Sequence, residues 1–228
     1  MKPRLDGRKV VFIRADHNRS PVWIAMLDRS SPPHALASID GVSAFFAGGD
    51  SVVFHSTGEN SSDLVYRVHQ DGSGLERLLS SPVIALYGIS PDRKWVAAWI
   101  AGSSPETRNS VVAIPIDGGT PVMICPGCGT AGAQRRGHTP PSVSWSPDQK
   151  FFYLVFKETP LNLYAIPLRD GQALPALPRS GIRSVADIEA LAGVRLVSES
   201  QAFAGPNPGL FAYTKVSTQR NIYRVGLP

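Results

Sequence analysis

Two stretches decide the fold: "GISPDRKWVAAWI" at residues 88–100 and "VSWSPDQKFFYLVF" at residues 143–156. In both, Ser-Pro-Asp is followed two places on by a lysine and then by a run of bulky apolar residues. Proline fixes φ near the value that a tight turn needs, and the aspartate can accept hydrogen bonds from nearby backbone N–H groups. The apolar run that follows is typical of a strand packed on both faces. The pattern therefore predicts a structural turn used twice. Ser90 and Ser146 lack the Gly-x-Ser-x-Gly context of a nucleophile elbow.

The same unit recurs along the chain. An aspartate precedes an apolar run at four points, spaced 44, 42 and 56 residues apart, which are Asp6, Asp50, Asp92 and Asp148. A more alternating strand follows each aspartate, and a fifth such strand stands at the end of the chain. Their anchors are spaced 43, 46, 52 and 59 residues apart at Trp23, Tyr66, Val112, Tyr164 and Tyr223. Three of these strands run into the hairpin-turn pairs Asp71-Gly72, Asp117-Gly118 and Asp170-Gly171. Periods of about 40–50 residues are typical of propeller blades made of four short strands.

The remaining strand of each unit is expected after the Asp-Gly turn. The segments "LERLLSS" at 75–81, "PVMICPG" at 121–127 and "ALPALPR" at 173–179 are predicted to fill this place. Residues 182–197, "IRSVADIEALAGVRLV", interrupt the repeat and are predicted to form a short helix or an irregular strand between the last two units.

"WSPDQK" followed by an apolar strand, a tyrosine-bearing strand and Asp-Gly resembles the WD40-like repeat of TolB-type β-propellers. The resemblance implies an all-β fold with about five blades of four antiparallel strands. The blades would cover residues 4–40, 41–83, 84–127, 139–180 and 184–228. The first is expected to lack its innermost strand, and the last to end after its third strand. TolB-type rings commonly have six or more blades, so the resemblance implies a partial or open ring.

Composition narrows the class of protein further. With 43% hydrophobic residues, the chain can bury a sizeable core. No apolar run approaches the ~18 residues of a membrane span, and the start has no signal-peptide h-region. The sequence therefore predicts no membrane span and does not indicate a cellular compartment. The alternative is that the chain is an extracytoplasmic part of a longer protein. Net charge is +5, but the basic residues are scattered, which predicts a solvated basic surface and no nucleic-acid partner.

Cys125-Pro-Gly-Cys128 has the spacing of half a zinc ribbon, but the sequence offers no second pair of ligands. A redox Cys-x-x-Cys usually opens a helix, whereas this pair ends a strand. We interpret the two residues as loop cysteines or a local disulfide, with metal binding and redox chemistry as the alternatives. The five histidines share no metal-ligand spacing, so neither a metal site nor a cofactor is predicted.

The binding candidates lie in the long polar loop from Cys125 to Pro141, which holds Arg135, Arg136 and His138. Long loops of this kind are where propellers tend to carry function. The strand aromatics are instead predicted to be core between blades: Trp23, Trp95, Trp99, Trp145 and Tyr164.

These features favour a non-enzymatic binding or sensor module with a protein or peptide partner. The ending "LFAYTKVSTQRNIYRVGLP" resembles the propeller regions of bacterial kinase-linked or regulator-linked proteins, which implies a fragment of a larger bacterial protein. The alternative is a propeller that accompanies a prolyl-oligopeptidase-like hydrolase domain. Such a domain needs a nucleophilic serine, an aspartate and a histidine in about 200 further residues, and none follow the repeats in this sequence.

Overall fold

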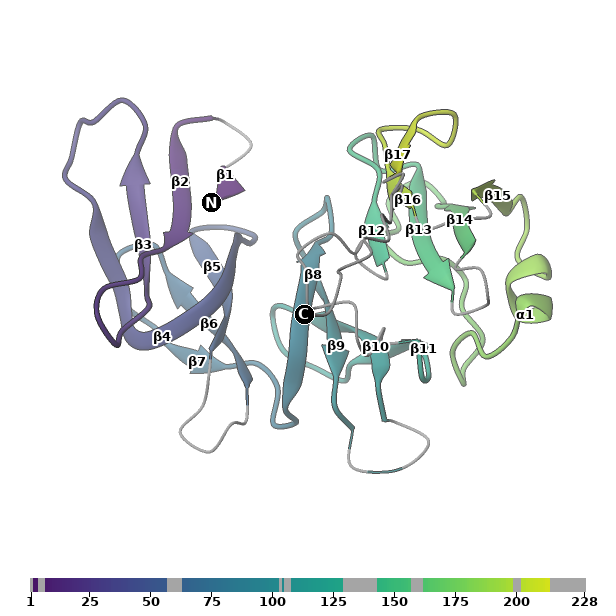
Figure 1. Cartoon of the computed structure of the whole chain (residues 1–228), viewed down its shortest axis with the longest axis horizontal. Coiled ribbons are helices and arrows are strands. Elements are labelled where there is room, and N and C mark those ends of the chain that lie inside the picture. The colour runs from purple at the N-terminus through teal and green to yellow at the C-terminus, as the bar shows by residue number, and fades with distance from the viewer. Residues whose placement is uncertain are drawn as a thin grey trace, which may run out of the picture.

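A computed structural model describes residues 2–3, 7–56, 63–102, 104, 108–128, 143–156, 162–198 and 202–213 of the 228-residue chain. All strand pairs are antiparallel, and the sheets follow one another along an arc (Figure 1). Among the described residues, no strand pairing joins the last strands to the first.

The first two sheets share one long strand. The first contains β1 (Lys2–Pro3), β2 (Lys9–Ile13), β3 (Pro21–Met26) and the start of β4 (His34–Phe46). The second contains the end of β4, then β5 (Ser51–Ser56), β6 (Leu64–His69) and β7 (Glu76–Arg77). The expectation that the first unit lacks its innermost strand is wrong, because β1 pairs with β2 in that place.

Gly41 marks the point where β4 leaves the first sheet and enters the second. A Cβ atom there would lie 2.6 Å from Val22 Cγ2 and 2.9 Å from Ile13 Cδ1. Only glycine lets the strand pass so close to the first sheet. The predicted boundary at residues 40 and 41 thus falls inside a continuous strand rather than in a linker.

The third sheet is built in the order of the repeat, from β8 (Val83–Ile89), β9 (Trp95–Ile100), β10 (Ser110–Pro115) and β11 (Val122–Cys125). The fourth contains β12 (Val143–Trp145), β13 (Phe151–Phe156), β14 (Asn162–Pro167) and β15 (Arg195–Ser198). β16 (Ala202–Ala204) and β17 (Phe211–Tyr213) form a separate two-stranded sheet.

The fourth sheet corrects one strand prediction. Residues 173–179 form no strand, and β15 pairs with β14 instead. This segment contains "LPALP", and its two prolines have no backbone N–H to donate to a neighbouring strand. A strand is therefore disfavoured here. Helix α1 (Val185–Glu189) lies between this segment and β15, so the predicted short helix is confirmed.

The middle strands pack on both faces, as their apolar runs predict. On β13, Phe152, Leu154 and Phe156 share a core cluster with the third sheet, whereas Tyr153 and Val155 pack with Ala202 of β16. Further buried clusters join the first sheet to the second and the second to the third. Each sheet is therefore held by the sheets next to it, as in other repeat architectures.

The connection from β14 to β15 covers the edge of the third sheet. The Ile182 backbone N–H donates to the carbonyl of Ile124 on β11, at 2.8 Å. The side chains of Ile182 and Ile188 are fully buried in the core cluster between the third and fourth sheets. This connection protects a strand edge that would otherwise offer unpaired backbone groups.

The two Ser-Pro-Asp turns have the same hydrogen bonds. In the second, Ser146 Oγ donates to Asp148 Oδ1 at 2.6 Å and accepts from the Phe151 N–H at 2.9 Å. Asp148 Oδ1 also accepts from the Lys150 N–H at 3.1 Å. In the first turn, Ser90, Asp92, Lys94 and Trp95 make the corresponding contacts. The predicted structural turn is confirmed.

Replacing Ser146 with alanine is expected to lower the free energy of unfolding by about 2 kcal/mol, because the N–H of the half-buried Phe151 loses its side-chain acceptor. Ser90→Ala should have a similar effect through Trp95. Urea denaturation measures both. The matched control is Ser43→Ala, since the buried Ser43 hydroxyl has no hydrogen-bond partner among the described residues and its loss should be neutral. Equal costs for Ser146→Ala and Ser43→Ala would contradict the role of the turn.

Candidate functional site

The inner ends of three successive sheets surround a hollow of about 450 Å³. Its lining comes from the end of β4, from β8 with the Ser90 turn, and from β12 with the Ser146 turn. We call it the inner hollow. Its size is within the range of pockets that take small ligands or peptide side chains. The repeat itself builds it, because each sheet contributes its first strand, and the third and fourth sheets also contribute the turn that follows.

Aromatic side chains dominate the wall of the inner hollow: Phe45, Phe46, Tyr87 and Trp145. The half-buried Trp145 has a fixed orientation, since its Nε1 donates to the Ala173 carbonyl at 2.6 Å. Its ring also meets Phe152 edge-on, with the centroids 5.5 Å apart. An aromatic side chain with a fixed orientation can contact a ligand with little further loss of conformational entropy.

Arg93 is the one charged residue among the described residues that line the inner hollow. It occupies the left-handed position of its turn, with φ of 59°, and its Nη1 lies 3.4 Å from the Ala47 carbonyl. Gln149 occupies the matching position in the other turn, with φ of 63°. One guanidinium among aromatic rings favours a ligand group that carries negative charge.

The carboxylates of Asp92 and Asp148, in the two nearby turns, accept hydrogen bonds from backbone N–H groups of those turns. The Ser146 hydroxyl, followed by the Lys150 N–H, holds the pKa of Asp148 below its usual value of 3.8. Since the folded pKa is depressed, this stabilisation is present above pH 3.8 and is lost as the pH falls below it. The lining described here includes no carboxylate. The buried hydroxyls of Ser90 and Ser146 are likewise committed to the turns.

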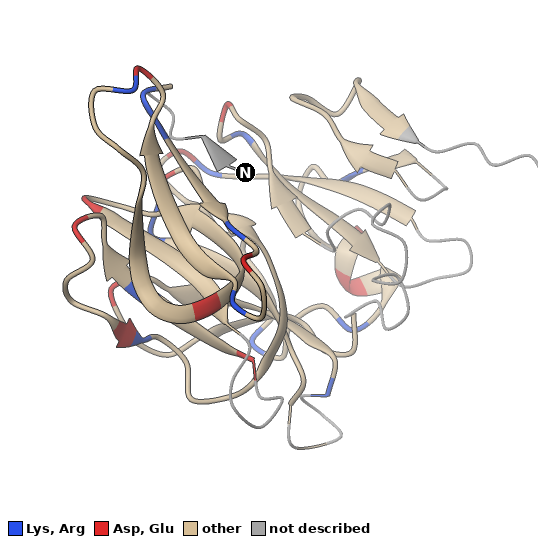
Figure 2. Cartoon of the chain, turned by 60° about the vertical axis from the view of Figure 1, so that its left-hand side comes forward, with Lys and Arg blue, Asp and Glu red and all other residues tan. Residues whose placement is uncertain are grey.

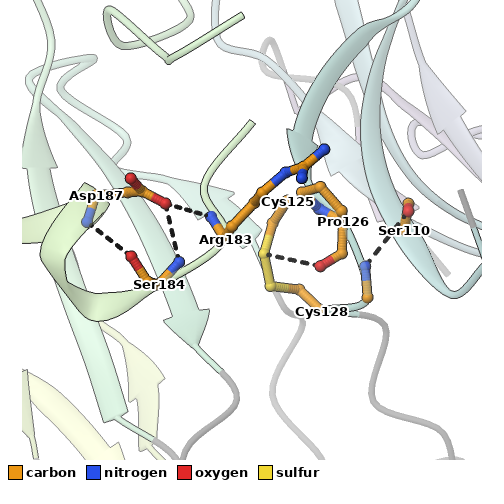
Figure 3. Close-up of a disulfide and its surroundings, with 8 residues drawn as sticks. Ser110, Cys125, Pro126, Cys128, Arg183, Ser184 and Asp187 are labelled. Atoms are coloured by element: carbon orange, nitrogen blue, oxygen red, sulfur yellow. Dashed lines mark hydrogen bonds between the residues drawn. A yellow bond between two sulfur atoms is a disulfide. The ribbon is translucent and has the colours of Figure 1, made fainter. Parts of the chain in front are cut away.

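The sequence-predicted candidates lie elsewhere. Arg135, Arg136 and His138 fall outside the described residues. Cys125 and Cys128 are joined in a disulfide at the end of β11, which leaves no thiolate for a metal (Figure 3). Within the described part of the chain, no three His, Cys, Asp or Glu side chains gather as a metal site would require.

Most of the strand aromatics lie in the core between sheets, as predicted. Trp99 and Tyr164 are buried, and the half-buried Trp95 and Trp145 pack against the core cluster of the third and fourth sheets. Trp145 also lines the inner hollow, and Trp23 is half-buried on β3. Sequence analysis missed Phe45, Tyr87 and Arg93 as site residues. The available signal was position: Tyr87 lies three residues before the turn serine, and Trp145 lies one residue before it.

Charge on the described surface is mixed. Figure 2 shows Lys and Arg interspersed with Asp and Glu, largely in turns and at strand ends. Arg67 illustrates this, since it pairs with Glu76 and, at 3.0 Å, with Asp117 of the third sheet. No described helix is long and apolar enough to cross a membrane.

No family model matches the chain, and neither does any curated protein. TolB from Acinetobacter baumannii aligns with 73% of this chain, with a TM-score of 0.53 and 14% identity. A putative TolB from Agrobacterium tumefaciens aligns with 92% of the chain and 72% of its own length, with a TM-score of 0.53 and 12% identity. The chain has the fold of a TolB-like β-propeller. It spans 40% of the length of the Acinetobacter protein.

A prolyl endopeptidase structure aligns with 90% of this propeller chain and 31% of its own length, with a TM-score of 0.49 and 11% identity. At these identities the likeness to solved structures concerns the fold alone. The residues of the inner hollow therefore have to carry any functional argument for this propeller.

Proposed function

We propose that this chain is a non-enzymatic binding module of a larger bacterial protein, and that its partner is a protein or peptide segment. The observation that carries the proposal is the inner hollow, whose aromatic wall and single arginine are suited to a peptide that bears a carboxylate. A sensor role, as in kinase-linked propellers, follows if ligand binding here is transmitted to the rest of such a protein.

The proposed absence of catalysis is supported by the chemistry of the same surface. Two of its three serines, Ser90 and Ser146, are tied into turns, and no histidine or carboxylate stands beside them among the described lining residues. Acyl transfer would need a serine with an adjacent base, and glycoside hydrolysis would need paired carboxylates.

The test is selection of binding peptides. We expect a displayed library of random linear peptides, panned on the whole chain, to enrich sequences that carry Asp or Glu. Calorimetry should then show about tenfold weaker binding for Arg93→Gln, because the charge-assisted contact is lost. Gln149 already fills the equivalent turn position, so this variant is expected to keep the fold.

Trp23→Phe is the matched control, since Trp23 lies on β3 and does not line the inner hollow. Its affinity should equal that of the unmodified chain, and Trp145→Phe should weaken binding. Enriched peptides that bind all three variants equally would place the binding surface elsewhere and contradict the proposal.

A further inference from the structure

The Cys125–Cys128 disulfide lies at the joint between the third and fourth sheets. It closes the short turn that ends β11, and both residues are buried in the core cluster that these two sheets share. A disulfide across so few residues removes less entropy from the unfolded chain than a long-range one. Its main structural effect is therefore local: it fixes the shape of the turn at residues 125–128.

The β14–β15 connection rests on this turn. A Cβ atom on Gly181 would lie 2.8 Å from Met123 Cγ, 3.0 Å from the Ile124 carbonyl and 3.0 Å from Pro126 Cδ. The next residue, Ile182, donates its N–H to the Ile124 carbonyl at 2.8 Å. The β14–β15 connection thus contacts the last residues of β11 and Pro126, which lies between the two cysteines of the disulfide.

A second hollow, of about 390 Å³, adjoins the disulfide on the side of Cys128. Its lining includes Gly127, Cys128, Phe156 and Arg183, but not Cys125. Figure 3 shows the exposed Arg183 side chain extending from the start of α1 toward the Cys125–Pro126 turn. Arg183 and Cys128 both line this hollow, so a negatively charged thiolate that enters it meets a cationic side chain.

We propose that this disulfide is a redox-cleavable latch for the 181–190 segment, opened by a dithiol reductant that enters the second hollow. One thiolate of the reductant attacks Cys128 Sγ, the sulfur–sulfur bond breaks, and Cys125 leaves as a thiolate. The second thiolate of the reductant then attacks the mixed disulfide, which releases the Cys128 thiolate and oxidises the reductant to its cyclic disulfide. Both cysteine thiolates then take up protons from water.

Opening the latch frees Pro126 and Gly127 to move, and the close contact with Gly181 is then no longer held in place. The Ile182–Ile124 hydrogen bond is the first backbone bond that this movement breaks. The inference is independent of the proposed peptide site, since the residues that line the inner hollow do not include 125–128 or 181–190.

Hydrogen exchange followed by mass spectrometry tests the latch on the whole chain. After treatment with dithiothreitol, amides in residues 181–190 should exchange about tenfold faster, whereas those of β13 keep their rate. The Cys125→Ala, Cys128→Ala double variant should show the fast rate from the start and should not respond to dithiothreitol. Reoxidation of the unmodified chain should restore the slow rate.

Three results would overturn the proposal. The 181–190 amides could be unaffected by reduction, all sheets could accelerate by one factor, or the disulfide could resist dithiothreitol until the chain is unfolded. Arg183→Gln tests the route of entry: its disulfide should be reduced several-fold more slowly, and an unchanged rate would remove the second hollow as the entry route.

Discussion

Gly181→Ala is expected to lower the free energy of unfolding by about 3 kcal/mol. Two costs combine at this position. Its φ of +73° is strained for a residue with a Cβ atom, at about 1–2 kcal/mol. The added methyl group would also lie within 3.0 Å of Met123, Ile124 and Pro126, and overpacking of this kind costs about 1–3 kcal/mol. The midpoint of urea denaturation, at unchanged m-value, measures the loss.

Gly171→Ala is the matched control for this prediction. Gly171 has the same φ of +73°, but a Cβ atom there would meet nothing within 4 Å. It should therefore show the backbone cost alone, about 1 kcal/mol. The difference between the two variants isolates the packing of the β14–β15 connection against β11. If both variants lose the same stability, the close contact at Gly181 contributes nothing and the connection is not tightly docked.

The part of the fold that sequence predicts well is local. Ser90 and Ser146 lie in turns that the tripeptide itself builds, so the turn can be predicted from three residues and their hydrogen-bonding groups. The left-handed glycines of the Asp-Gly turns are of the same kind: Gly72, Gly118 and Gly171 all have positive φ. The two-sided apolar runs of β9 and β13 likewise predict strands packed between neighbouring sheets.

The inner hollow could not be predicted in this way, because its residues come from three sheets. Tyr87 and Trp145 are distant in sequence, and each reads as an ordinary strand aromatic until β8 and β12 are placed side by side. The fourth strand of the fourth sheet was missed for a related reason. β15 pairs with β14 only after a long connection has crossed to β11 and back, and no local pattern records such a path.

Phe152→Ala and Phe54→Ala are each expected to lower the stability of the sheet–sheet interface that contains the ring by about 4 kcal/mol. Both rings are fully buried, and truncating a buried phenylalanine leaves a cavity. Phe54 packs between the first and second sheets and stacks on Tyr66, with centroids 5.6 Å apart. Phe152 packs between the third and fourth sheets beneath Trp145. Hydrogen exchange resolved by sheet should therefore show two different patterns of loss.

In an array held by nearest-neighbour contacts, each cavity should weaken mainly the interface that contains it. Phe54→Ala should accelerate exchange in β2, β3, β5 and β6 and leave β13 and β14 protected, and Phe152→Ala should do the reverse. The fluorescence of Trp145 should change in Phe152→Ala and not in Phe54→Ala, because the Trp145 ring contacts Phe152 and Phe54 stacks on Tyr66 instead. If either variant instead accelerates every sheet by one factor, the chain unfolds as a single cooperative unit. The long strand β4 would then be the physical reason, since it is shared by the first two sheets and couples them directly.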